Sequence, residues 1–213
     1  MKPSAKTTIS RLSKRGSYEE VVIHAILDEA KVCTVAYCQG DQPFQIPTGF
    51  VRIDNKIYIH GSVGSHFLLQ IADGRKVCIT VTLLDGLVLA RSVFDSSMNY
   101  RSAVVFSEGK VIDNLSERER IFEAFTEKMI PGRWADVRTP NESEIKKTII
   151  LEFPILEASA KIREGLPFDG EDERDPSVWW GIIPQKMVYT EPQPHPEIKP
   201  GVMLPEYIKN LIK

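Results

Sequence analysis

The 213-residue sequence has no large excess of charge, few cysteines and no long hydrophobic run. Its net charge is −2 and its basic residues are scattered, so we expect no nucleic-acid-binding surface. No stretch of about 18 apolar residues is present, and the N-terminus lacks the apolar segment of a signal peptide. Three cysteines without framework spacing argue against disulfides and for a reducing compartment. These absences predict a soluble cytoplasmic protein that binds neither membrane nor nucleic acid.

Familiar catalytic and metal-binding motifs are also missing. The four histidines form no Ser-His-Asp set, no H-E-x-x-H motif and no zinc pattern with the cysteines. His24 lies in an expected helix and His195 in a proline-rich segment, whereas His60 and His66 flank a Gly/Ser-rich loop. We therefore predict no metal site and identify no catalytic residue. A redox cofactor that supplies the chemistry is the more natural interpretation.

The hydrophobic pattern changes from a helical period to a period of two after about residue 30. Two capping-box patterns, at Ser17-x-x-Glu20 and Ser116-x-x-Glu119, predict the first turns of two longer helices. Short helices are expected over 65–72 and 142–147. Strands are expected over 31–37, 44–53, 56–60, 76–84, 87–92, 100–112 and 148–162, with turns at 39–41, 54–55 and 85–86.

This pattern favours a mainly β protein. Six or seven strands joined mostly by short turns, with three or four helices and no β-α-β alternation, are typical of a small antiparallel barrel. No internal repeat is present, so one folded domain is expected. We divide the chain into a flexible basic N-terminal tail (1–16), the barrel domain (17–187) and a proline-rich C-terminal extension that packs on the surface (188–213).

The Gly/Ser-rich loop from His60 to His66 is the first candidate site. It lies between an expected strand and an expected helix, and its glycines allow backbone N–H groups to turn toward a ligand. Ser62 and Ser65 add hydroxyl groups at the start of the helix. The arrangement suits a phosphate group; the alternative is an ordinary loop with Ser65 as the helix cap.

Three further segments are polar or irregular where a strand pattern predicts otherwise. The polar residues around 91–102 fit a phosphate or ring-edge site, a subunit contact, or a solvated hairpin end. Pro47 removes a ladder donor, which indicates an edge strand or bulge. The residues beside it can then offer free backbone groups to a ligand; the alternative is a plain edge strand. Exposure of Trp179 and Trp180 to solvent in a polar region is energetically unfavourable. Either they cover a planar ligand, or they join the tail to the barrel.

Together, seven short motifs resemble those of the pyridoxamine 5′-phosphate oxidase-related flavoproteins, in the branch that contains the 5-nitroimidazole reductases. Each motif is modestly specific, and the resemblance depends on their order and spacing over most of residues 12–187. The motifs lie at residues 26–30, 46–48, 58–62, 87–92, 97–102, 131–134 and 179–184.

The resemblance implies a six-stranded antiparallel Greek-key split barrel that forms a homodimer and binds FMN between the subunits. It assigns backbone contacts with the isoalloxazine to one strand, the ribityl and phosphate to the Gly/Ser-rich loop, and further contacts to the partner subunit. The residues concerned are Ile46, Pro47 and Thr48; His60, Gly61, Ser62, Ser65 and His66; Thr82; Asn99, Tyr100, Arg101 and Ser102 of the partner; and Trp179 near the ring.

The resemblance also implies an FMN-dependent oxidoreductase that reduces a small planar substrate, such as a nitroaromatic or a quinone. The alternatives are a non-catalytic flavin carrier or sensor, and a related barrel that binds haem or a deazaflavin, with His60 or His66 as the iron ligand. Oxidation of a phosphorylated vitamer is disfavoured, because residues 65–67 are Ser-His-Phe where the oxidase carries basic side chains.

Overall fold

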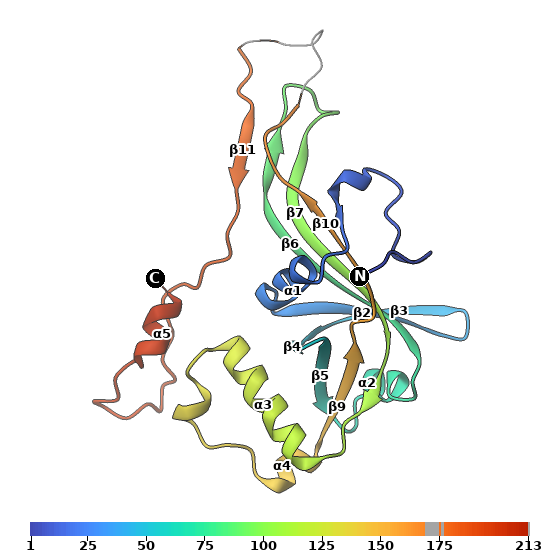
Figure 1. Ribbon diagram of the computed structural model, residues 1–213. Coiled ribbons are helices and arrows are strands. Elements are labelled where there is room, and N and C mark those ends of the chain that lie inside the picture. Colours follow the sequence, from blue (N-terminus) through green and yellow to red (C-terminus); the bar gives the residue numbers. More distant parts are fainter. Residues whose placement is uncertain (169–174, 176, 213) are drawn as a thin grey trace.

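The computed structural model describes residues 1–168, 175 and 177–212 of the chain. Two antiparallel β-sheets enclose a common core (Figure 1). The larger sheet has the order β1-β10-β7-β6-β2-β3, with β11 paired to β6, and the smaller has the order β4-β5-β9-β8. The strands are β1 Gly16–Ser17, β2 Val32–Gln39, β3 Gln42–Gly49, β4 Val51–Ile53, β5 Lys56–Ser62, β6 Lys76–Leu89, β7 Ser97–Glu108, β8 Lys110–Val111, β9 Thr148–Pro154, β10 Glu157–Arg163 and β11 Gly181–Pro184.

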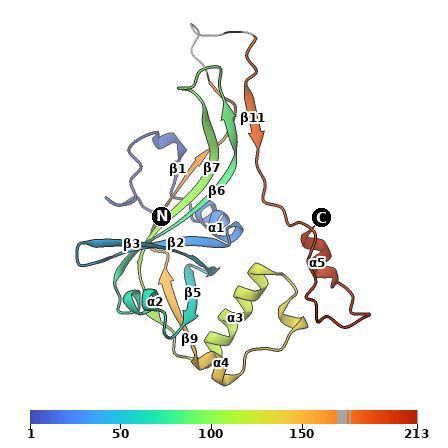
Figure 2. The same cartoon turned by 180° about the vertical axis from the view of Figure 1, so that it is seen from behind.

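Helices flank the sheets in the part of the chain that the structure describes. They are α1 Glu20–Glu29, α2 His66–Ile71, α3 Leu115–Met129, α4 Glu142–Lys146 and α5 Glu206–Leu211, with 3-10 turns at Ser13–Arg15 and Trp134–Asp136. Helix α1 inserts Ile23, Ile26 and Leu27 into the core between the sheets. Helix α3 lies along the smaller sheet and shares a second apolar cluster with it (Figure 2). No helix of the described residues is long and apolar enough to cross a membrane.

The chain passes between the sheets at two places where the sequence predicted an unbroken strand. The expected strand 44–53 divides at Phe50 into β3 and β4, and the expected strand 148–162 divides at Ile155 into β9 and β10. Phe50 and Ile155 are both fully buried, so each bend is fixed in the core. Residues 150–153 of β9 are buried on both faces, so no polar alternation marks the bend at Ile155.

The tight turn expected at Asp85-Gly86 is wrong. Strand β6 runs through this position to Leu89, with a bulge between Leu84 and Gly86. A side chain at position 86 would clash with the neighbouring strand, since an ideal Cβ there lies 2.7 Å from the Ile183 carbonyl oxygen of β11. The glycine is therefore explained by close strand approach rather than by a turn.

The outer parts of β6 and β7 (residues 83–103) and β11 project from the body of the molecule, and we call them the arm (Figure 1). Strand β2 pairs with β6 only through its residues 34–36, which lie opposite residues 78–80 of β6. Strand β11 pairs instead with residues 86–89 of β6. The two strands therefore cover different stretches of the same edge of β6.

Both capping boxes predicted for the longer helices are wrong, and the capping box that the structure has, in the short helix α4, was not predicted. Ser17 lies in β1, and α1 follows Glu19, which makes no side-chain cap bond. Helix α3 begins before Ser116, capped by Asn114, whose side chain accepts a backbone N–H at 3.0 Å. Helix α4 confirms the short helix expected over 142–147 and begins with a complete capping box.

The two ends of the described chain pack against the body. On the N-terminal side, Thr7 is buried and Lys6 forms an ion pair with Glu157 of β10 at 2.6 Å. On the C-terminal side, Tyr207 of α5 accepts a hydrogen bond from Arg133 at 2.8 Å and donates one to Asp136 at 2.6 Å.

Candidate functional site

The Gly/Ser-rich loop closes β5 and opens α2, as predicted. The Ser65 hydroxyl caps α2 by accepting a backbone N–H at 3.4 Å, and the Ser62 hydroxyl accepts another at 3.2 Å. Both hydroxyls keep their own proton to donate. The backbone N–H groups of His66 and Phe67 have no acceptor among the described residues. The loop therefore presents hydrogen-bond donors and is suited to an anionic group.

The two glycines of this loop have different roles. An ideal Cβ at Gly61 would lie 2.7 Å from the Leu68 side chain, so this glycine lets α2 approach β5. An ideal Cβ at Gly64 would meet only the Ser62 hydroxyl, at 3.7 Å. Space is therefore open over Gly64, beside the free donors.

Lys147 adds positive charge at this loop. Its carbonyl oxygen accepts the Val63 N–H at 3.0 Å, and β5 pairs with β9 so that Ser62 lies opposite Thr148. The Lys147 side chain is exposed and forms no ion pair with any described residue. Sequence reasoning missed Lys147, because only the β5–β9 pairing brings it beside a loop more than eighty positions away.

His60 lies on β5, under helix α3. Its ring is half-buried and meets Phe125 edge-on, with ring centroids 4.2 Å apart, and Phe122 at 5.8 Å. The Nδ1 atom is buried and has no hydrogen-bond partner among the described residues. Burial lowers the pKa of His60, so the imidazole is neutral at neutral pH. A neutral ring nitrogen can bind a ligand or a metal ion, and within this subunit the Nδ1 atom is covered.

The strand predicted to contact the flavin ring is an edge strand. Strand β3 ends the order of the larger sheet, which confirms the interpretation of Pro47. Strand β3 ends at Gly49, and after Phe50 the chain enters β4, where Val51 pairs with Tyr58 of β5. Residues Ile46–Thr48 therefore lie on the strand that leads into the neighbour of β5, the strand that carries His60.

Apart from Trp179, which precedes β11, the remaining predicted site residues lie on the larger sheet, mostly in the arm. Thr82 pairs with Ser102, and Leu84 pairs with Tyr100. The loop, in contrast, belongs to the smaller sheet and α2. Within one subunit, the structure does not bring these residues to the loop.

Two of the polar side chains in the arm already have partners. Arg101 forms ion pairs with Asp85, at 2.7 Å, and with Glu29. These hydrogen bonds raise the pKa of Arg101 above its ordinary value. The Asn99 side chain accepts a hydrogen bond from Arg163 and donates one to the Gly165 carbonyl at 3.3 Å.

The paired tryptophans have different surroundings. The Trp180 ring lies 4.1 Å from the Arg91 guanidinium, a cation–π contact that joins the C-terminal segment to the arm. Trp179 is 63% exposed and is free to cover a further surface. Of the two predicted roles, contact between the C-terminal segment and the rest of the protein is the one seen for Trp180.

The described residues contain no group of three or more His, Cys, Asp or Glu side chains placed to hold a metal ion. Cys33 is buried, and burial raises the pKa of its thiol to about 12. It therefore stays protonated and unreactive at neutral pH.

Comparison with known proteins identifies relatives over most of the chain. The family model described as pyridoxamine 5′-phosphate oxidase matches residues 19–162. The FAD and heme binding protein from Mycobacterium smegmatis is 34% identical, with a TM-score of 0.88, and the match covers 93% of this chain and 97% of that one. The flavocytochrome Anf3 from Azotobacter vinelandii is 32% identical, with a TM-score of 0.90 and coverage of 98% and 97%. A search among curated sequences found no match.

The fold is shared more widely. A putative 5-nitroimidazole antibiotic resistance protein from Bacteroides thetaiotaomicron is 16% identical, with a TM-score of 0.59 and coverage of 80% and 90%. The predicted mainly β split barrel is confirmed by these structures. Because the family model matches more than half of the sequence, the chain belongs to the pyridoxamine 5′-phosphate oxidase family.

Proposed function

We propose that this protein binds a flavin between the Gly/Ser-rich loop and the edge of β3 and acts as a flavin-dependent oxidoreductase. The observation that carries the proposal is the set of free donors in the loop, the amides of His66 and Phe67 with the hydroxyls of Ser62 and Ser65. Two relatives of 34% and 32% identity are named for a flavin, one of them for FAD. The motifs of this chain favour FMN.

In this proposal, different residues bind different parts of the flavin. The loop donors and the Lys147 ammonium would hold the flavin phosphate, while backbone groups of Ile46–Thr48 would face the ring. Flavins supply hydride or single-electron transfer when bound, and the protein positions and tunes them. The substrate we propose is small and planar, such as a nitroaromatic or a quinone, which would stack on the exposed ring.

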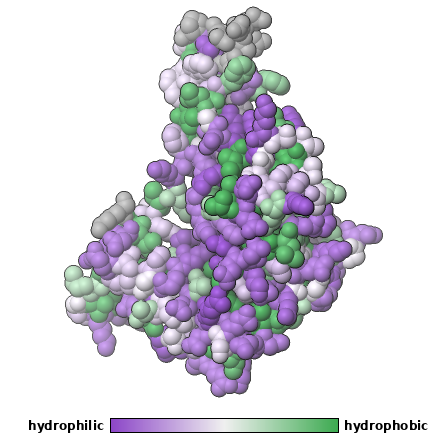
Figure 3. Space-filling view, viewed as in Figure 1, coloured by the Kyte–Doolittle hydropathy of each residue, from purple (hydrophilic) through white to green (hydrophobic). Residues whose placement is uncertain are grey.

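We further propose a homodimer in which the arm of each subunit completes the flavin site of the other. The outer face of β2, β6 and β7 carries half-buried, uncharged residues: Thr34, Ala36, Cys78, Thr80, Val104 and Phe106. A groove of about 1150 Å³ opens on part of this face, and its lining also includes the charged residues Lys6, Arg75, Lys76 and Glu157. Apolar side chains also gather on the arm, where Figure 3 shows hydrophobic patches: Leu84, Leu87, Val93, Phe94, Met98 and Ile183. Uncharged and apolar surface of this extent is typical of a subunit interface.

The test of the proposal is the identity and behaviour of the cofactor. Freshly purified protein should show paired absorption bands in the near-ultraviolet and blue, and mass spectrometry of the denatured extract should separate FMN from FAD. Under anaerobic conditions, NADH or NADPH should bleach these bands, and a nitroaromatic or quinone should restore them. A colourless protein overturns flavin binding, whereas a flavin that cannot be reduced favours a passive carrier.

A second candidate function is haem binding, alone or beside the flavin. The observation that favours it is His60, whose neutral ring presents a buried, unpartnered Nδ1 among aromatic side chains. Two relatives are named as a heme-binding protein and a flavocytochrome. A Soret band in the purified protein, lost in His60→Ala and kept in His24→Ala, would establish this ligand; the same band in both variants would exclude His60.

A further inference from the structure

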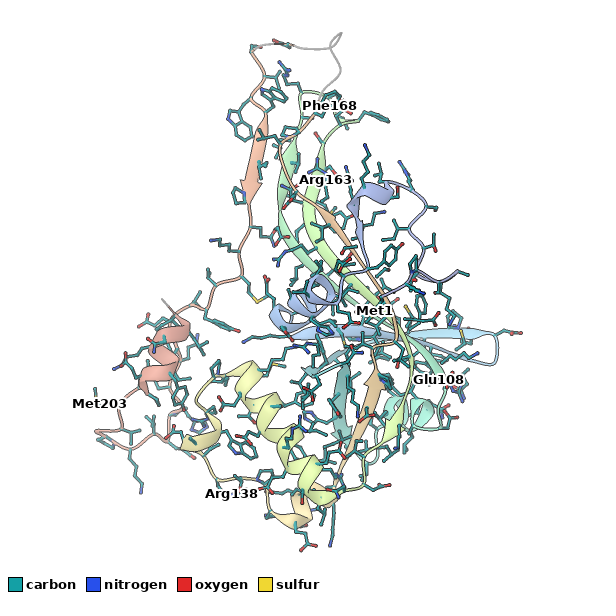
Figure 4. The ribbon with its side chains drawn as sticks, viewed as in Figure 1. Met1, Glu108, Arg138, Arg163, Phe168 and Met203 are labelled. Carbon is teal, nitrogen blue, oxygen red and sulfur yellow. The ribbon has the colours of Figure 1, made fainter. Side chains whose placement is uncertain are left out.

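A small pocket lies between the N-terminal segment and the end of β10, separate from the loop described above. Its volume is about 340 Å³, and its lining includes Lys14, Arg15, Ser17, Arg163 and Glu164. Strand β1 pairs with β10 here, which places the N-terminal segment beside Arg163 (Figure 4). The pocket belongs to the larger sheet, whereas the Gly/Ser-rich loop belongs to the smaller sheet and α2.

Arg163 is the central residue of this pocket. It is only 9% exposed, and one of its terminal nitrogens donates to the Asn99 side chain. Its Nε is buried and has no hydrogen-bond partner among the described residues. No carboxylate of the described residues forms an ion pair with its guanidinium. Within the part of the chain that the structure describes, Arg163 is therefore a buried cation without a compensating charge.

The neighbouring charges make this situation less favourable. Arg15 is half-buried at the same pocket, and desolvation together with the Arg15 charge lowers the pKa of Arg163. Lys14 adds a third positive charge. Glu164 is exposed and makes no ion pair with a described residue. A buried, unpaired charge beside like charges is costly, and a bound anion would remove that cost.

We propose that this pocket binds a phosphate group, either free or carried by a small phosphoester. A guanidinium offers a planar set of N–H donors that matches phosphate oxygens, and a second cation strengthens such a contact. The side chains of Arg163, Arg15 and Ser17, which carry such donors, line one volume. That volume holds a phosphate and part of an attached group. The pocket shares no residue with the flavin loop, but Arg163 donates to Asn99, which is predicted to contact the partner's flavin, so the flavin content is measured beside phosphate binding.

The test is a titration of the full-length protein, with the cofactor it carries as purified. Calorimetry with sodium phosphate and with ADP, at ionic strength kept constant with sodium chloride, should give saturable binding at one site per chain. Arg15→Gln should weaken this binding at least about tenfold, since charge-assisted hydrogen bonds are lost. Arg11→Gln is the matched control, because Arg11 is an exposed arginine of the same segment outside the pocket, and it should bind as the wild type does. Equal affinity for phosphate and ADP would identify the phosphate as the recognised group, and tighter ADP binding a phosphoester.

Substitution of the buried Arg163 gives a second readout, the melting temperature. Arg163→Met should abolish binding and, without phosphate, should melt at a higher temperature than the wild type because an unpaired buried charge is removed. If that variant does not fold, Lys14→Gln joins Arg15→Gln as the test. The proposal is overturned if neither phosphate nor ADP binds saturably, or if Arg15→Gln binds them as the wild type does. It is also overturned if Arg15→Gln lowers only the content of bound flavin, because the pocket would then serve that cofactor.

Discussion

At the scale of single residues, the candidate site depends on a few polar groups that the fold leaves without partners. The amides of His66 and Phe67, the ring nitrogen of His60 and the ammonium of Lys147 gather at one end of the smaller sheet. Of these groups the His60 ring nitrogen is buried, and a buried polar group without a partner is rare in folded proteins. Three of these groups donate hydrogen bonds, which is the arrangement an anionic cofactor requires.

The contribution of Lys147 can be measured directly. Lys147→Gln should weaken flavin retention by roughly tenfold, because a charged donor beside the phosphate is replaced by a neutral one. Lys146→Gln is the control, since the adjacent Lys146 forms an ion pair with Glu142 at 2.7 Å. Fluorescence of flavin released during dialysis gives the dissociation constant for each variant. Equal retention in the two variants would remove Lys147 from the site.

The burial of His60 predicts a dependence of stability on pH. Because burial lowers the pKa of His60, the unfolded chain binds a proton more readily than the folded chain does. The free energy of unfolding should therefore fall as the pH drops from about 6.5, the ordinary histidine value, toward the lowered pKa. His60→Phe should flatten this part of the profile, as measured by urea unfolding between pH 5 and pH 7.5. His195→Gln, at an exposed position, should keep the wild-type slope; a slope that survives in His60→Phe would assign it to another group.

At the scale of the elements, local signals identified most strands but not the sheet to which each belongs. Turns at 39–41 and 54–55 formed as expected, because glycine or a left-handed residue fixes them locally: Gly40 and Asp54 both have positive φ. The bends at Phe50 and Ile155 depend on burial in a core built from distant segments. No local signal separates such a bend from a continuous buried strand.

In the candidate site, too, features set by consecutive residues were predictable and features set by distant segments were not. The Gly/Ser-rich loop was predictable because strand, glycines, serines and helix are consecutive in the sequence. The placement of Lys147 and the separation of Thr82 from the loop were not, because both follow from strand pairing across the sheets. The family motifs supplied the expectation of a partner subunit, which no periodicity in one chain contains.

The close contact of β6 and β11 predicts the effect of a single methyl group. Gly86→Ala places a Cβ at 2.7 Å from the Ile183 carbonyl oxygen, so β11 must move. We expect a loss of about 1–3 kcal/mol from this overpacking. Hydrogen exchange should report faster exchange at Ile182 and Ile183 in the variant. Gly64→Ala, whose methyl group meets only the Ser62 hydroxyl at 3.7 Å, should leave β11 unchanged; equally slow exchange in both variants would contradict the role of Gly86.

At the scale of the whole molecule, the two halves of the predicted flavin site lie on different parts of one subunit. The loop and β3 form one half, and the arm carries the other. A second subunit that packs on the uncharged outer face of β2, β6 and β7 would bring a partner's arm to the loop. The proposed homodimer is the arrangement in which all the predicted residues would serve one cofactor.

This arrangement predicts that assembly and cofactor binding fail together. Thr80→Arg places a charge in the middle of the uncharged face, and unpaired charge at an interface is strongly unfavourable. The variant should be monomeric in sedimentation velocity and should lose most of its flavin. Glu123→Arg, on the exposed face of α3, should change neither property. A monomeric variant that keeps its flavin would show that one subunit is sufficient.

Strand β11 has a consequence for how the molecule behaves in a crowded solution. Beyond the stretch paired with β2, the edge of β6 would offer unpaired N–H and C=O groups, and β11 occupies residues 86–89 of it. Free strand edges are templates for adding strands from other chains. A chain that ended before Gly181 would therefore gain a tendency to polymerise through its arm. The C-terminal segment thus protects this strand edge from pairing with other chains.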